Sequence, residues 1–397
     1  MESGEEHDPA HVQPRDDTAA RLRRRLLDGL RSSGQLRSPD VERAMDAVPR
    51  ELFTPPGTDL REAYADRVVV LATDSTGSPI STVSQPAIVA LMLEQLDVRA
   101  GHRILEIGTG SGYNTALLAE LTGPRGSVTS IEVDDSLLAS AAARLTDLAP
   151  GEGTPLDLRR GDGWLGVPDT APYDRLESTV GVDDLPPAWR TQLADGGVLV
   201  APLWLRPGLE LSLAMRREGA LLHSTSVEQC GFLQLRGPHA ADPHSRALGQ
   251  GLAVIGEGLS TKQLEMVRTL TDTGGTDLGA APRLSERRWW GLSLSDPRTL
   301  LITGRHGGHV AWGLFDADGP DGAGLAVVHD GRVIGYGDGN AADVLRQRVE
   351  DAPPVDPSRL TVTAYPPDAT IPAPPSRGFS WRITREHHRY RVHWQPE

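Results

Sequence analysis

The sequence predicts an α/β fold with a Rossmann-like, doubly wound sheet, followed by a C-terminal α+β domain. An apolar strand pattern at 104–107 runs into a glycine-rich turn, and strand and helix patterns then alternate to about residue 236. Such alternation is typical of parallel strands joined by right-handed crossovers. Because 397 residues exceed one average domain, we expect two domains. We place a disordered N-terminus at 1–18, a first domain at 19–236 and a second at 237–397.

The N-terminal part of the first domain is expected to contain three helices. Apolar residues recur at helical spacing from residue 19, and Ser38-Pro39 predicts the start of a second helix. A loop-rich segment follows at 49–83. Pro86 occupies the favourable first-turn position of a third helix over 87–96.

The remaining elements follow from periodicity and turn signals. In the first domain we expect helices at 114–121, 136–148 and 187–193, and strands at 128–131, 156–159, 176–180, 197–202, 209–215 and 221–227. In the second we expect helices at 261–270 and 341–349, and strands at 289–294, 299–303, 309–315, 324–329, 332–336, 360–364 and within 379–394. Asp330-Gly331 predicts a two-residue hairpin turn.

The glycine turn is the strongest functional signal. Gly108, Gly110 and Gly112 allow tight bends and close approach to a ligand. The dinucleotide fingerprint requires a third glycine where this chain has Tyr113. The turn therefore favours S-adenosylmethionine over NAD, although a glycine-rich turn alone is also compatible with a purely structural role.

An acidic residue supports the same cofactor. Glu132 ends the next strand, 20 residues after Gly112, where a carboxylate can accept hydrogen bonds from both ribose hydroxyls. Glu106, just before the glycine turn, is a second acidic residue that supports a cofactor site.

Composition excludes several other classes. A net charge of −14 argues against a nucleic-acid partner, and we interpret the basic run at 21–25 as a solvated helix face. The sequence has no apolar run of about 20 residues, and its N-terminus is acidic; we expect a cytoplasmic protein without membrane contact. The single cysteine, Cys230, is expected to be a small buried hydrophobe. Although His306 and His309 have tolerable ligand spacing, no acidic or cysteine partner accompanies them, so we expect no metal.

Several motifs, in order along the chain, resemble the protein-L-isoaspartate O-methyltransferase family. The match covers roughly residues 20–236, and its order is more specific than any single motif. The matching segments are AMDAVPRELF at 44–53, AYAD at 63–66, TVSQP at 82–86, LEIGTGSGY at 105–113, GDG at 161–163, APYD at 171–174 and LADGG at 193–197.

The resemblance implies roles for individual residues. Ser84, with Thr82, would contact the acceptor carboxylate; the alternative is that both hydroxyls only satisfy a loop before a helix. Asp162 would accept the adenine amino group, or would simply stabilise a turn. The cofactor, S-adenosylmethionine or its product S-adenosylhomocysteine, would be held by Val83, Glu106, Gly108, Thr109, Gly110, Ser111, Gly112, Glu132, Val133, Asp162 and Gly163.

The 161 residues after Arg236 are similar to extensions in a branch of the family that tailors ribosomally made peptides such as lanthipeptides and graspetides. This implies methylation of an aspartate in a modified peptide, leading to aspartimide and isoaspartate, with the second domain binding that peptide. The alternative is repair of isoaspartyl damage in proteins. A lone Gly77, where the family has a Gly-x-Gly pair, leaves the substrate open. A cofactor-binding recognition module and an NAD-dependent oxidoreductase are less favoured alternatives.

Overall fold

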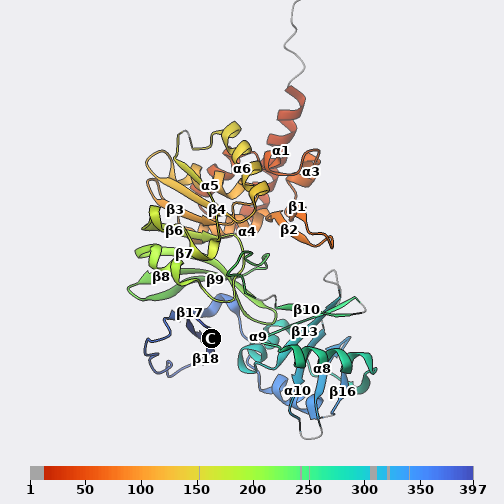
Figure 1. The fold of residues 1–397 in the computed structure, drawn as a ribbon. Helices are drawn as coiled ribbons and strands as arrows, with labels where there is room; N and C mark the ends of the chain where they lie inside the picture. Colours follow the sequence, from red (N-terminus) through yellow and green to blue (C-terminus); the bar gives the residue numbers. More distant parts are fainter. Residues whose placement is uncertain are drawn as a thin grey trace, which may run out of the picture.

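A computed structural model describes residues 13–151, 153–241, 244–249, 251–304, 311–319, 322–338 and 340–396. It contains a ten-stranded sheet in the order β18-β19-β17-β9-β8-β7-β6-β3-β4-β5, a seven-stranded sheet and a separate hairpin, β1–β2 (Figure 1). Within the described residues, no helix is long and apolar enough to cross a membrane.

The centre of the ten-stranded sheet is parallel, which confirms the predicted doubly wound α/β fold. Four consecutive residues of β3 are buried, as expected for a strand covered on both faces. The parallel strands are β3 (Arg103–Ile107), β4 (Ser127–Glu132), β5 (Leu156–Arg160), β6 (Tyr173–Ser178) and β7 (Leu193–Arg206). The helices of this region are α4 (Pro86–Leu96), α5 (Tyr113–Thr122), α6 (Asp135–Leu148) and α7 (Pro187–Gln192), with 3₁₀ turns η2 (Gly163–Leu165) and η3 (Pro168–Thr170).

The N-terminal region differs from expectation at two points. Helix α1 (Gln13–Ser32) begins at residue 13, so residues 13–18 are helical rather than disordered; residues 1–12 lie outside the described residues. The loop-rich segment contains the hairpin of β1 (Val69–Thr73) and β2 (Pro79–Val83), which projects from the body (Figure 1). The other elements here are α2 (Pro39–Ala47), capped by Ser38 as predicted, η1 (Arg50–Phe53) and α3 (Leu60–Ala63).

The last strands of the chain return to the first sheet. Strand β17 (Leu360–Tyr365) pairs antiparallel with β9 (Leu221–Gln229), and β19 (Arg389–Trp394) then pairs with β17 and β18 (Phe379–Thr384). Strand β8 (Leu209–Glu218) links β9 to the parallel centre. Residues 237–397 were expected to form one unit, whereas strand pairing divides them between the two large sheets.

The seven-stranded sheet is antiparallel, with the order β10-β11-β13-β14-β15-β16-β12. The predicted Asp330-Gly331 turn is confirmed, with both residues at positive φ (47° and 72°) between paired His329 and Arg332. The strands are β10 (Ser245–Gly249), β11 (Leu252–Gly256), β12 (Thr276–Ala280), β13 (Thr299–Gly304), β14 (Ala311–Asp316), β15 (Gly324–His329) and β16 (Arg332–Gly337). The helices are α8 (Thr261–Asp272), α9 (Glu286–Ser295) and α10 (Asn340–Asp351), with η4 (Pro357–Arg359) after them.

The prediction of a strand at 289–294 was wrong, because these residues lie within α9. Ser285 caps the helix by accepting a hydrogen bond from Arg288 N. Trp289 and Trp290 donate indole N–H bonds to the carbonyls of Pro207 and Gly208, in the β7–β8 turn, both at 2.9 Å. Packing against this distant turn overrides the strand preference of the aromatic residues.

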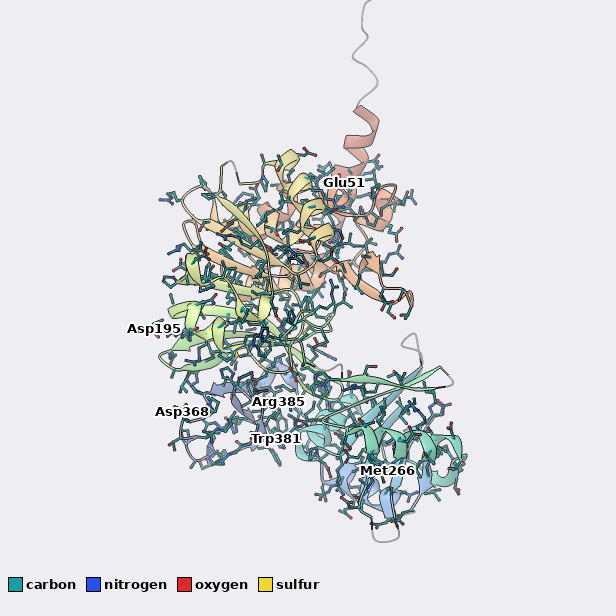
Figure 2. The ribbon with its side chains drawn as sticks, viewed as in Figure 1. Glu51, Asp195, Met266, Asp368, Trp381 and Arg385 are labelled. Atoms are coloured by element: carbon teal, nitrogen blue, oxygen red, sulfur yellow. The ribbon has the colours of Figure 1, made fainter. Side chains whose placement is uncertain are left out.

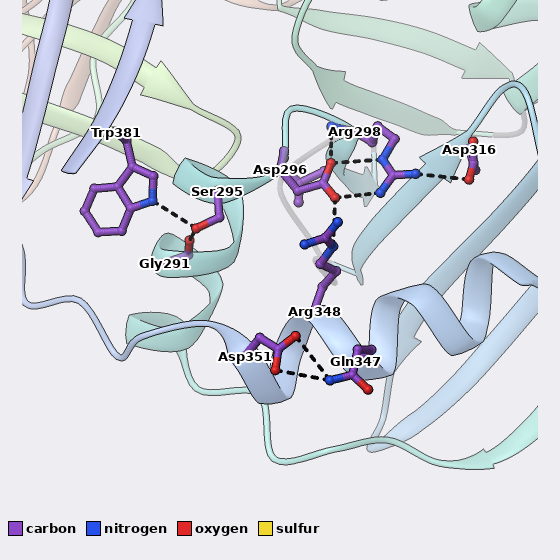
Figure 3. A network of polar contacts seen from close by, with 10 residues as sticks. Gly291, Ser295, Asp296, Arg298, Asp316, Gln347, Arg348, Asp351 and Trp381 are labelled. Atoms are coloured by element: carbon purple, nitrogen blue, oxygen red, sulfur yellow. Dashed lines mark hydrogen bonds and ion pairs between the residues drawn. The ribbon is translucent and has the colours of Figure 1, made fainter. Parts of the chain in front are cut away.

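Further contacts join the two large sheets. Trp381 on β18 donates to Ser295 Oγ on α9 at 2.9 Å (Figure 3). Arg385, labelled in Figure 2, lies between β18 and β19. It pairs with Glu257 and donates to the carbonyls of Asp183 and Leu205. The C-terminal hairpin therefore contacts both the seven-stranded region and the loops after the parallel strands.

Candidate cofactor and acceptor site

A cavity of about 600 Å³ lies at the carboxyl ends of the parallel strands. Its walls come from the β1–β2 hairpin, the start of α4, the glycine turn after β3, the ends of β4 and β6, and residues 229–236. Strand β3 has β4 on one side and β6 on the other. This is the switch point at which open α/β sheets bind ligands.

The three glycines of the turn serve different purposes. At Gly108 (φ 93°) a Cβ would lie 2.7 Å from Thr179 Oγ1, and at Gly112 (φ 87°) it would press on Ala141 and Leu145 of α6 at 3.3 Å. At Gly110 (φ 52°) the nearest atom would be Ser81 Oγ at 3.8 Å, across the cavity. Gly112 thus permits helix packing, whereas Gly108 and Gly110 lie in the cavity wall.

Glu132 lies at the end of β4 with its carboxylate held in place. One oxygen accepts Gly110 N at 3.0 Å, and the other accepts the backbone N–H groups of Val133 and Asp134 at 2.9 and 3.1 Å. The side chain lies in the cavity wall, and carboxylate oxygens have further acceptor capacity. This position suits the ribose contact expected of Glu132.

Glu106 lies outside the cavity wall, contrary to its expected place among the cofactor contacts. Its carboxyl group is fully buried and accepts hydrogen bonds from Thr115 Oγ1 and Ser130 Oγ, both 2.5 Å, and from Asn114 Nδ2 at 2.9 Å. Burial raises its pKa to about 7. Hydrogen bonds to Glu106 therefore link β3 to β4 and to the first turn of α5, and they stabilise the glycine turn between β3 and α5.

Asp162 also lies outside the cavity wall, although Gly163 is part of it. One carboxylate oxygen accepts Trp164 N at 3.0 Å. The other accepts His239 N at 3.2 Å and lies 2.7 Å from His239 Nδ1. A Cβ at Gly237 would lie 2.9 Å from the same carboxylate, so residues 237–239 cover the group expected to face adenine.

The remaining cofactor residues, Val83, Thr109, Ser111 and Val133, lie in the wall, as do Thr82 and Ser84. The loop carrying Ser84 is fixed on both sides. Asp66 accepts Ala87 N at 2.9 Å and Gln85 Nε2 at 3.0 Å, and buried Arg50 reaches the carbonyl of Val83 at 3.5 Å. Thr82 and Ser84 thus line the same cavity as the glycine turn.

Sequence reasoning missed Glu177 on β6 and Glu210 on β8, which both lie in the wall. Burial raises the pKa of Glu177 to about 8 and that of Glu210 to about 7. The sequence predicts a strand at 176–180, and a charged residue inside a strand expected to be buried is a signal that could have marked Glu177. Cys230 was expected to be a small buried hydrophobe, but it is only partly buried and lies in the wall; burial raises the pKa of its thiol.

The histidines give no metal cluster among the residues that the structure describes. His306 and His309 lie outside the described residues. His388, between β18 and β19, is buried with Nδ1 3.3 Å from Asp184 Oδ1.

Comparisons with known proteins agree with this geometry. The family model for protein-L-isoaspartate(D-aspartate) O-methyltransferase matches residues 21–239. A Methanopyrus kandleri protein named protein-L-isoaspartate O-methyltransferase is 38% identical over 223 residues, covering 56% of this chain and 94% of the relative. A relative of the same name from Anaeromyxobacter dehalogenans is 42% identical over 183 residues, covering 46% and 81%.

A solved protein-L-isoaspartate O-methyltransferase covers 86% of this chain and 96% of its own, at 25% identity and a TM-score of 0.51. That match extends beyond the 21–239 range of the family model, so it includes residues of the C-terminal part. The glycine turn, which added side chains would obstruct, and the oriented Glu132 fit S-adenosylmethionine. The chain therefore belongs to the protein-L-isoaspartate (D-aspartate) O-methyltransferase family and is an S-adenosylmethionine-dependent protein carboxyl O-methyltransferase.

Proposed function

We propose that this chain methylates the free carboxylate of isoaspartyl residues in peptides or proteins. The observation that carries the proposal is the single cavity that holds the glycine turn on one side and the Thr82–Ser84 loop on the other. The names of the relatives support the same acceptor, since those matched here are protein-L-isoaspartate O-methyltransferases.

The chemistry requires alignment more than proton removal. An acceptor carboxylate is ionised at neutral pH, because its reference pKa is about 4. S-adenosylmethionine supplies a methyl group bound to a positively charged sulfur. The hydroxyls of Ser84 and Thr82 would donate hydrogen bonds that orient the carboxylate, while Glu132 and the glycine turn hold the cofactor.

Apolar residues at the entrance would help to exclude water. Val68 and Val70 are 49% and 44% exposed, yet both lie in the cavity wall with Ile80. Phe232 lies in the same wall, on the segment after β9. A peptide placed between these segments would cover the acceptor carboxylate, and removal of water strengthens the electrostatic contacts there.

A second candidate is methylation of an ordinary aspartate in a ribosomally made, modified peptide, leading to aspartimide. One observation favours it: residues 229–236, which lead into the C-terminal part, form a wall of the cavity, and His239 contacts Asp162. The C-terminal part would then bind the peptide. However, a solved protein named protein-L-isoaspartate O-methyltransferase matches 86% of this chain. The presence of residues after 236 therefore does not by itself favour the second candidate.

Intact-mass spectrometry of three peptides tests the proposal. The peptides share one sequence and contain isoaspartate, aspartate, or aspartate within a constrained ring. We expect one methyl group on the isoaspartyl peptide and none on the linear aspartyl peptide. Methylation of the ring peptide alone would favour the second candidate and refute the first.

A further inference from the structure

Two buried carboxyl groups lie side by side beneath the glycine turn. Glu106 on β3 and Glu177 on β6 are directly paired in the parallel register. The amide of Asn114, in the first turn of α5, donates to both, at 2.9 Å to Glu106 Oε1 and 2.8 Å to Glu177 Oε2. The two side chains are 0% and 1% exposed.

The pair is asymmetric in its surroundings. Glu106 is enclosed and accepts hydrogen bonds from three side chains. Glu177 lies in the cavity wall, and among the described residues its one recorded side-chain hydrogen bond comes from Asn114. Burial and, to a smaller extent, the charge of Glu106 raise the pKa of Glu177 to about 8. A buried carboxyl group without a cationic partner is costly in its charged form, so Glu177 is suited to a ligand that brings a cation.

The order of the strands identifies which part of the cofactor meets Glu177. Glu132, suited to ribose, ends β4, and Gly163, which follows β5 in the cavity wall, lies where adenine is expected. Moving across the sheet in the opposite direction, from β4 through β3 to β6, leads to Glu177. With adenine expected at the β5 end, the methionine part of S-adenosylmethionine would extend toward β6, where Glu177 lines the same cavity as the Thr82–Ser84 loop that would orient the acceptor.

We propose that Glu177 binds the α-ammonium group of the methionine part of S-adenosylmethionine. The ammonium supplies three hydrogen-bond donors and a positive charge, and a cavity-facing carboxylate supplies the complement. The acceptor carboxylate is a poor alternative occupant, because it supplies no hydrogen-bond donor and would add a negative charge beside the buried Glu106–Glu177 pair. This assignment concerns cofactor binding alone, so it does not depend on which carboxylate the enzyme methylates.

Isothermal titration with two ligands isolates the contact. S-adenosylhomocysteine carries the α-ammonium, and its deamino analogue has hydrogen in that position. We expect the wild-type protein to bind the deamino analogue at least about tenfold more weakly, and Glu177→Gln to bind both ligands within about threefold of each other. Glu106→Gln is the matched control, since it removes the neighbouring charge but is expected to keep the wild-type preference.

Proton release gives an independent result that needs no variant. Because Glu177 is largely protonated in the ligand-free protein at pH 7, ionisation beside the ammonium would release protons when S-adenosylhomocysteine binds. Titrations in buffers of different ionisation enthalpy measure this release, which should disappear with the deamino analogue. Equal wild-type affinity for the two ligands, or full discrimination retained in a folded Glu177→Gln protein, would overturn the proposal.

Discussion

The two sides of the cavity are built in different ways. The centre of the cofactor side, the glycine turn and Glu132, comes from one continuous stretch of the chain, and backbone hydrogen bonds within it hold the Glu132 carboxylate. The acceptor side is assembled from the β1–β2 hairpin, the start of α4 and residues 229–236, which are far apart in sequence. Backbone geometry thus shapes the site expected to bind the cofactor. The proposed acceptor site depends instead on side chains from separate segments.

The contact between α9 and the β7–β8 turn, which lies outside the cavity wall, is expected to matter most for stability. Trp289→Ala removes a side chain that is 1% exposed and its bond to the carbonyl of Pro207. We expect a loss of about 3–5 kcal/mol in the free energy of unfolding, measured by denaturant titration. If the folded variant also lost affinity for S-adenosylhomocysteine, this contact would be more strongly coupled to the cofactor side than the structure indicates.

A substitution in the turn should affect the cofactor side alone. In Gly108→Ala the new Cβ would lie 2.7 Å from Thr179 Oγ1 at a φ of 93°, so the turn must move. We expect affinity for S-adenosylhomocysteine to fall about 100-fold by isothermal titration. Gly196→Ala is the control, because it also has positive φ (76°) but has no atom within 4 Å; a similar loss there would mean that backbone strain alone is responsible.

The buried carboxyl of Glu177 predicts a pH-dependent stability. Its pKa of about 8 in the folded protein lies above the ordinary value near 4.3, so the folded state binds the proton more tightly than the unfolded state. This stabilising contribution is complete below about pH 4 and is lost as pH rises through 8. Ligand-free Glu177→Gln should therefore gain on the order of 1–3 kcal/mol relative to wild type between pH 5 and 8.5. A constant difference across this range would contradict the raised pKa.

A change at the acceptor loop should leave the cofactor side intact. Ser84→Ala removes a proposed donor to the carboxylate, so we expect kcat/KM for an isoaspartyl peptide to fall about tenfold, the effect of about 1.4 kcal/mol. Affinity for S-adenosylhomocysteine should stay within about twofold. Ser78→Ala, in the turn of the β1–β2 hairpin and outside the cavity wall, is the matched control and should retain full activity. A tenfold loss of cofactor affinity in Ser84→Ala would show that the proposed role is wrong.

Local signals made the cofactor side predictable from the sequence. The glycine turn, the position of Glu132 and the Asp330-Gly331 hairpin depend on residues close together in the chain, and the structure has each where expected. The enclosed surroundings of Glu106 could not be predicted, because its partners Thr115 and Ser130 come from α5 and β4. The spacing of residues in the sequence does not reveal which side chains at the end of a strand point into a cavity.

Long-range contacts account for the other differences. The helix α9 forms because its tryptophans pack on the β7–β8 turn, some 80 residues earlier in the chain. The pairing of β17 with β9 joins residues near 363 to residues near 223, and no local pattern specifies such a partner. Residues 237–239 cover Asp162, which was expected to face adenine. This cover could not be predicted, because the sequence does not show where the segment after β9 runs.

The most direct test of the central claim is a methanol-release assay with labelled S-adenosylmethionine and paired isoaspartyl and aspartyl peptides. Methyl esters are hydrolysed in mild alkali and release the label as volatile methanol, whereas methylated nitrogen retains it. We predict alkali-labile label on the isoaspartyl peptide and background label on its aspartyl counterpart. Alkali-stable label would contradict carboxyl methylation, and label on aspartyl peptides alone would contradict isoaspartate as the acceptor.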